Sequence, residues 1–130
     1  MSKEVQRYHS ATPWEKEVGY CRAIRVGNQI FVSGTSPVLL GGEVAFVGDP
    51  FRQAKHCFEL VEKALVELGG GLVNVVRTRQ YVTDITLWRE FARAHREAFS
   101  DHVPVTSMVE VQRLIDPRML IEIEAEAVLI

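Results

Sequence analysis

The sequence predicts an α+β fold in which a mixed β-sheet carries two helices on one face. Two observations lead to this prediction. Segments rich in β-branched and aromatic residues alternate with two longer segments in which apolar residues recur every three or four positions. The last β-type segment, roughly residues 120–129, alternates strictly between apolar residues and glutamates. The predicted order is therefore β-hairpin, helix, strand, helix, strand, strand.

The N-terminal part of the chain predicts an irregular arm followed by a hairpin. Residues 1–18 are polar and show no periodicity, so we expect no regular element there. Residues 20–26 and 29–33 are two strand-like runs joined by Gly27-Asn28. Glycine suits the first central position of a type II′ turn, which favours a hairpin at this point.

Two amphipathic helices are predicted. Asp49 can accept a hydrogen bond at the N-cap of the first helix, Pro50 is tolerated at its first position, and the glycines at 69–71 end it. The second helix is expected at about residues 86–99. The positions expected to face the sheet are Phe51, Ala54, Cys57, Phe58, Val61, Ala64, Leu65 and Leu68 in the first helix, and Trp88, Phe91, Ala94, His95, Ala98 and Phe99 in the second.

The three remaining strands are predicted at about 72–83, 105–114 and 120–129, and alternate side chains of each point to opposite faces. We expect the more aliphatic side of each strand to contact the helices, Val76 included. The opposite face then collects Arg77, Arg79, Tyr81, Thr106, Met108, Glu110, Glu122 and Glu124. Two interpretations of this face stay open: contact with solvent, or contact with another subunit in which the mixed charges pair and a pocket forms between chains.

Composition narrows the class of protein. The 130 residues fit one domain, 1–130, and the formal net charge of −2 argues against a dedicated nucleic-acid binder. The chain contains no apolar run of the length that a membrane span needs, and its N-terminus is too polar for a signal peptide, so we expect a cytoplasmic protein. The two cysteines and four histidines show no zinc-binding spacing, so we expect no metal site.

Five segments in order resemble the Rid family, the reactive intermediate deaminases also called the YjgF or L-PSP family. They are residues 19–20, 32–34, 77–84, 104–111 and 121–125, and the match extends over about 19–128. The resemblance implies a chorismate-mutase-like (ferredoxin-like) fold that closes into a homotrimer. In such a trimer the sheets form a central barrel, and three clefts between subunits each receive a small molecule.

The resemblance also implies an activity and site residues. Founding members hydrolyse enamines and imines without a metal or organic cofactor. Tyr20 matches the family's cleft tyrosine, Gly34 a backbone position that lines the cleft, and Glu122 the carboxylate that orients or activates water. The carboxylate-binding arginine of the family is replaced here by Thr106, and the neighbouring cysteine position by Met108.

The replacement of that arginine leaves the function open between three interpretations. The first is an imine or enamine deaminase that is slow or has an altered substrate, with Glu122 and Tyr20 as its catalytic groups. The second is a trimer that binds a metabolite without turnover, and the third is an endoribonuclease or translation inhibitor of the L-PSP type. We hypothesise that Arg77 or Arg79 supplies the missing cation; pairing with Glu110 or Glu124 is the alternative for these arginines.

Overall fold

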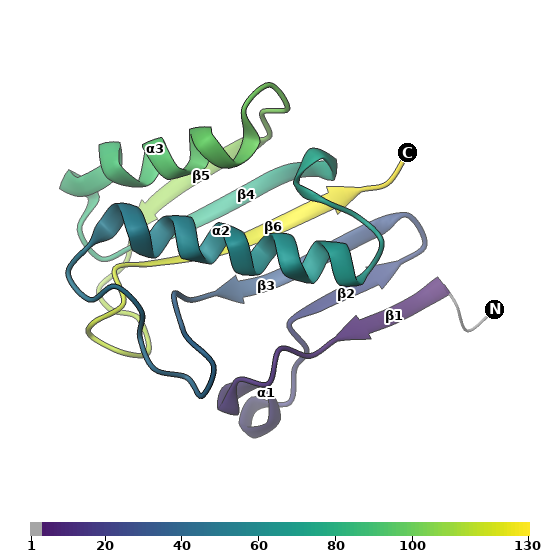
Figure 1. The fold of residues 1–130 in the computed structure, drawn as a ribbon, viewed down its shortest axis with the longest axis horizontal. Coiled ribbons are helices and arrows are strands. Elements are labelled where there is room, and N and C mark those ends of the chain that lie inside the picture. The colour runs from purple at the N-terminus through teal and green to yellow at the C-terminus, as the bar shows by residue number, and fades with distance from the viewer. Residues whose placement is uncertain (1–3) are drawn as a thin grey trace.

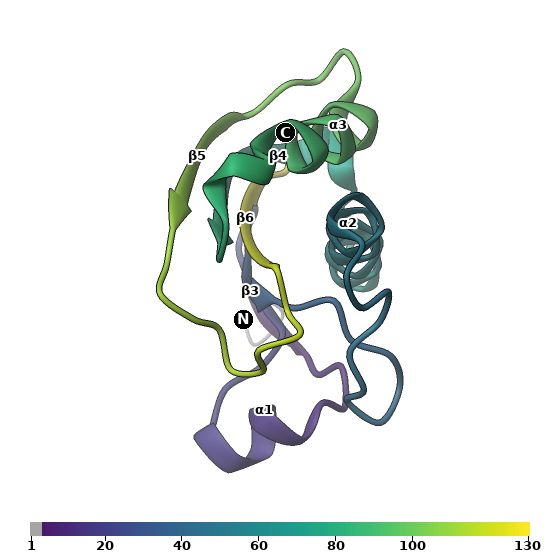
Figure 2. The same ribbon diagram turned by 90° about the vertical axis from the view of Figure 1, so that its left-hand side faces the viewer.

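The computed structural model describes residues 4–130. A six-stranded sheet in the order β1-β2-β3-β6-β4-β5 carries α2 and α3 on one face (Figures 1 and 2). All neighbouring strands are antiparallel except β4 and β5, which are parallel and joined through α3. The strands are β1 (Val5–Tyr8), β2 (Ala23–Val26), β3 (Gln29–Thr35), β4 (Val75–Val82), β5 (Val105–Glu110) and β6 (Ile121–Val128); the helices are α1 (Pro13–Val18), α2 (Pro50–Glu67) and α3 (Trp88–Phe99).

The prediction of an irregular N-terminal arm is wrong. Residues 5–8 form β1, an edge strand that pairs with β2, and α1 begins at Pro13 and ends at Gly19 with φ +89°. The strand is exposed along most of its length, so its sequence lacks the apolar alternation by which strands are found. Its hydrogen bonds come from β2, a partner that a local pattern does not show.

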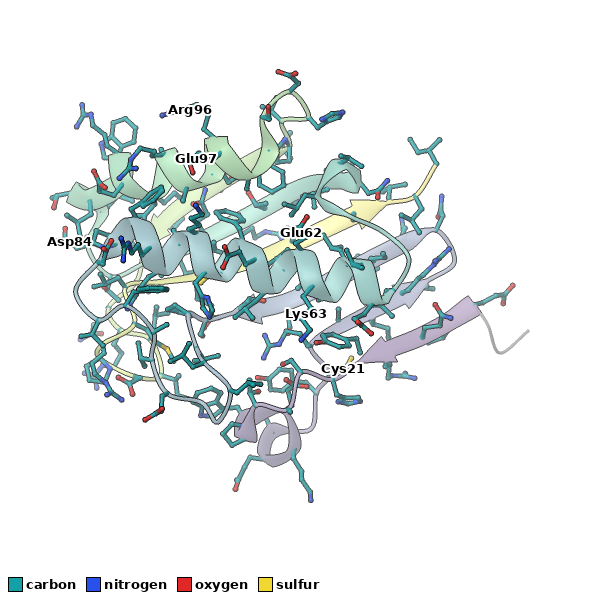
Figure 3. The ribbon with its side chains drawn as sticks, in the orientation of Figure 1. Cys21, Glu62, Lys63, Asp84, Arg96 and Glu97 are labelled. Atoms are coloured by element: carbon teal, nitrogen blue, oxygen red, sulfur yellow. The ribbon has the colours of Figure 1, made fainter. Side chains whose placement is uncertain are left out.

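The two long helices are where the sequence predicts them. The Asp49 side chain accepts a hydrogen bond from the Arg52 amide at 3.0 Å, which caps α2. Charged side chains such as Lys63 of α2 and Arg96 of α3 are exposed on the outer faces of these helices (Figure 3). In residues 4–130, no helix is both long and apolar enough to span a bilayer.

One helix position differs from the prediction. Trp88 was expected to face the sheet, but its side chain is 45% exposed and Arg89 stacks on its ring at 4.5 Å. The chain forms a one-turn 3₁₀ helix, Ile85–Leu87, before α3. Ile85 and Leu87 of this turn pack against the core, and Trp88 lies outside it.

The central strand confirms the predicted division into two faces. Ile121, Ile123, Ala125 and Ala127 of β6 are all buried under the helices, whereas the glutamates between them are half-buried on the open face. Val76 does not follow the prediction. The register between β4 and β6 shifts between Val75 and Arg77, so Val75 is buried in the core and Val76 is exposed.

The prediction is also wrong about which face of the sheet two residues of the edge strand β5 occupy. Thr106 and Met108 were expected on the open face, but parallel pairing aligns them with Thr78 and Gln80, which are buried on the helix side. The Thr106 hydroxyl accordingly accepts hydrogen bonds from Thr78 and Gln80, at 2.7 and 3.1 Å. In a short edge strand with mixed polarity, the register of the partner decides which side faces the core.

Glu110 also departs from the expected open face. It is aligned with Val82, a core residue, and its carboxylate accepts a hydrogen bond from the Ile85 amide at 2.9 Å. The strand ends at Glu110, four residues earlier than the sequence predicts.

Candidate functional site

A cavity of about 270 Å³ lies at the end of the sheet where β3 ends and β6 begins. Tyr20, Gly34 and Glu122, three of the residues predicted for the site, all line it. Its other walls come from α1, from Leu60 of α2, from the connection after β3 and from the connection between β5 and β6. Figure 2 shows α1 and the β5–β6 connection at this same end of the sheet.

The Glu122 carboxylate occupies space that only a glycine at position 34 leaves free. A Cβ atom on residue 34 would lie 2.8 Å from Glu122 Cδ and closer still to Oε2. Gly34 lies in a bulge of β3, because the register with β6 shifts between Val32 and Thr35. Ser36 then donates a hydrogen bond to Glu122 Oε1 at 3.2 Å. The bulge and the missing side chain therefore place this carboxylate at the cavity wall.

Arg22 also lines this cavity, and it is not among the residues predicted from the sequence. Its guanidinium lines the cavity with only 7% of the side chain exposed. Nη2 donates to the Tyr20 hydroxyl at 3.2 Å, Nη1 donates to Ser33 Oγ at 3.1 Å and to the Gly34 carbonyl, and Nε donates to Ser10 Oγ at 3.2 Å. Arg22 thus ties two predicted site residues, Tyr20 and Gly34, to one rigid group.

The charge of Arg22 is balanced by Glu15 of α1. Arg22 Nη2 lies 3.6 Å from Glu15 Oε2, and both side chains are buried. Glu15 also accepts hydrogen bonds from the hydroxyl groups of Ser10 and Thr12. Burial alone would raise the pKa of Glu15, but these hydrogen bonds and the Arg22 charge outweigh it and hold the pKa below its usual value. Glu15 is therefore ionised at neutral pH.

One sequence signal for this pair was available. Thr12-Pro13-Trp14-Glu15 has the residue types of a helix N-terminus: threonine, a proline in the first turn and an acid three residues later. The pattern gives the position of α1 and so of Glu15. For Arg22 we find no comparable signal, because a single arginine in a hairpin strand is ordinarily a solvated side chain.

The other predicted site residues do not line the cavity. Thr106 and Met108 lie on β5, the strand at the far edge of the sheet. Arg77 and Arg79 do point to the open face, as predicted, but they pair with glutamates of β6. Arg79 Nη1 lies 2.8 Å from Glu126 Oε2 and 3.7 Å from Glu124 Oε1, and Arg77 Nε lies 3.9 Å from Glu126 Oε1.

Glu122 differs from the two glutamates that follow it on β6. Glu124 and Glu126 both pair with arginines of β4, and Glu124 also accepts a hydrogen bond from Tyr81 at 2.8 Å. Within residues 4–130, Glu122 forms no ion pair. The same part of the chain gathers no group of three or more His, Cys, Asp or Glu side chains that could hold a metal ion. The cavity therefore offers the Glu122 carboxylate, the Tyr20 phenol, the Arg22 guanidinium and hydroxyl groups such as that of Ser36.

Comparison with known proteins places this chain and its fold in a known family. The family model described as Endoribonuclease L-PSP matches residues 11–129. An uncharacterized protein of Streptomyces coelicolor is 37% identical over 129 residues, covering 97% of this chain and 93% of its own. The 3-aminoacrylate deaminase RutC of Acinetobacter baylyi is 30% identical over 108 residues, covering 83% of this chain and 85% of its own.

A solved structure agrees with this family in both fold and sequence. A Mycobacterium tuberculosis protein of the YjgF/YER057c/UK114 family superimposes with a TM-score of 0.87 and 42% identity, over 96% of this chain and 99% of its own. The fold is therefore that of the YjgF proteins. This chain belongs to the Endoribonuclease L-PSP family, the family also known by the YjgF name.

Proposed function

We propose that this protein is a homotrimeric, cytoplasmic hydrolase of enamines and imines, with its active site at the Glu122 cavity. The single observation that carries the proposal is the Glu122 carboxylate, which lines a 270 Å³ cavity beside Tyr20 without an ion-pair partner in residues 4–130. A carboxylate in that setting is free to accept a proton from water. The deaminase activity named for the Acinetobacter relative supports the reaction class.

The proposed reaction needs only water and these side chains. An enamine first takes a proton from solvent on its carbon and becomes an iminium ion. Water then attacks the iminium carbon, a C–O bond forms, and Glu122 takes the proton of the water. The same proton returns to nitrogen and the C–N bond breaks. Ammonia leaves as the hydroxyl group gives its remaining proton to Glu122 and the oxygen lone pair forms the carbonyl. Tyr20 accepts a hydrogen bond from Arg22, so its own proton can stabilise the developing oxygen charge.

Trimer formation is proposed from the open face of the sheet. Phe31, Val105 and Val109 are between 40% and 59% exposed on this face, beside the glutamate–arginine pairs of β6 and β4. Apolar side chains at this exposure, flanked by paired charges, suit contact with another copy of the chain. Thr106 and Met108 lie on the edge strand β5, and the Thr106 side chain is exposed there although it is on the helix side. In our proposal this edge of the sheet lies beside the cavity of a neighbouring subunit.

The proposal is tested by an imine-hydrolysis assay on the purified protein, after its oligomeric state is measured by light scattering. An amino-acid oxidase supplies carboxylate-bearing imines, and an amine oxidase supplies imines without a carboxylate. Semicarbazide competes with water for each imine, and formation of the semicarbazone is followed. We expect the protein to slow semicarbazone formation from at least one imine, because it hydrolyses the imine before semicarbazide reacts with it. A folded trimer that slows semicarbazone formation from none of them would overturn the hydrolase proposal in favour of a metabolite-binding trimer.

Substituting Gly34 by alanine is expected to lower imine turnover by about 100-fold, because the added methyl group displaces the Glu122 carboxylate. Gly71→Ala is the matched control. Gly71 has an extended backbone, and a Cβ atom there would meet no described atom within 4 Å. We expect Gly71→Ala to turn over imines as the wild type does. Wild-type turnover in Gly34→Ala would contradict the role given to this glycine.

A further inference from the structure

We infer that the Glu122 cavity selects small cationic ligands, with an iminium or amidinium group on an apolar body and no carboxylate. This inference rests on the proposed function only in taking the ligand as a substrate. The selection itself follows from three features of the cavity: the contacts that Arg22 already makes, the charge of Glu122, and the apolar walls.

The first step is that Arg22 cannot serve as an anion clamp. Among the residues of one subunit that the structure describes and that line the cavity, only Arg22 and Glu122 are charged. The Arg22 guanidinium makes four hydrogen bonds within the protein, and its charge is matched by Glu15 at 3.6 Å. An incoming carboxylate would have to break these contacts to reach it, at the cost of exposing a buried pair.

The second step is that one negative charge remains. With Arg22 and Glu15 cancelling, Glu122 is the uncompensated charge at the cavity wall. A carboxylate ligand would be repelled by it, whereas a cation would pair with it. The partly enclosed site strengthens both effects, because charges interact more strongly away from bulk water.

The third step is the shape and lining of the cavity. Trp14, Val38 and Leu60 form apolar walls, and an aromatic ring such as that of Trp14 also attracts a cation. The volume of about 270 Å³ is below the range of about 300–1,000 Å³ found for drug-sized ligands. The cavity therefore suits one small ring or a short alkyl group that carries the cationic C=N.

Three ligands of nearly the same shape test this selection: benzamidinium, benzamide and benzoate. Their binding to the wild-type protein is measured by isothermal titration calorimetry at neutral pH. We expect benzamidinium to bind at least about 10-fold more tightly than benzoate, a difference of about 1.4 kcal/mol. Glu122→Gln should remove this preference, whereas Glu124→Gln, a change on the same strand but outside the cavity, should retain it.

The outcomes separate this inference from the hydrolase proposal. Benzoate binding as tightly as benzamidinium, or a preference that survives Glu122→Gln, would overturn the inference. In the turnover assay, a higher kcat/KM for carboxylate-bearing imines would overturn it too, while leaving the hydrolase proposal standing. A cation preference in a protein that turns over no imine would support the inference and defeat the hydrolase.

Discussion

Replacing Glu122 by glutamine is expected to lower imine turnover by about 10²- to 10⁴-fold, the usual contribution of a positioned general base. Glutamine keeps the size of the side chain and can still contact Ser36, but its amide does not accept a proton from water. The measurement is kcat/KM from the slowing of semicarbazone formation, using the imine that the wild-type protein hydrolyses fastest.

The control for this prediction is Glu124→Gln. Glu124 lies two residues further along β6 and also faces the open side of the sheet, but it pairs with Arg79 and Tyr81 and does not line the cavity. We expect its loss to leave turnover near the wild-type value. Equal losses in the two variants would show that the charge of the sheet face matters, and not a base at Glu122.

Replacing Arg22 by methionine is expected to destabilise the protein by about 3–5 kcal/mol, because it leaves the Glu15 carboxylate buried without its partner. The free energy of unfolding is measured in urea at one protein concentration. The double variant Glu15→Gln/Arg22→Met should be less destabilised than the sum of the two single changes, since the second change removes the unpaired charge. Strict additivity would show that the two side chains do not interact.

The Glu15–Arg22 pair also predicts a pH dependence of stability. The pKa of Glu15 is held below its ordinary value of 4.5 in the folded protein. A carboxyl group with a lowered folded-state pKa stabilises the protein fully above its unfolded pKa and loses this contribution as the pH falls through the folded one. We expect the Glu15→Gln variant to show a weaker loss of stability below pH 4.5 than the wild type. An unchanged acid dependence would assign that loss to other groups.

The parts of the fold that the sequence predicts are those in which a local pattern and the tertiary environment agree. β6 alternates because one of its faces packs under α2 while the other faces away. α2 is predicted down to its Asp49 cap because a cap is a contact between residues three apart. The family resemblance also assigned Tyr20, Gly34 and Glu122 to one cleft. The three residues line one cavity in the structure, although Glu122 is far from the other two in the chain.

The parts that the sequence does not predict depend on partners distant along the chain. β1 is a strand because β2 lies beside it, and Thr106 faces the helices because β4 sets the register of β5. Arg22 is buried beside Glu15, which lies on α1, in a segment that was predicted to have no regular structure. A charged residue is ordinarily predicted to be exposed to solvent, and only the structure shows that a partner allows its burial.

The location of Glu122 on an interior strand has a consequence for how such proteins can diverge. β6 is bonded on both sides, to β3 and β4, and shifting it by one residue would turn Ile121 and Ile123 out of the core. The cavity walls, in contrast, come largely from α1 and two connections at the surface. Mutation can therefore alter what enters the cavity while the carboxylate is inherited unchanged.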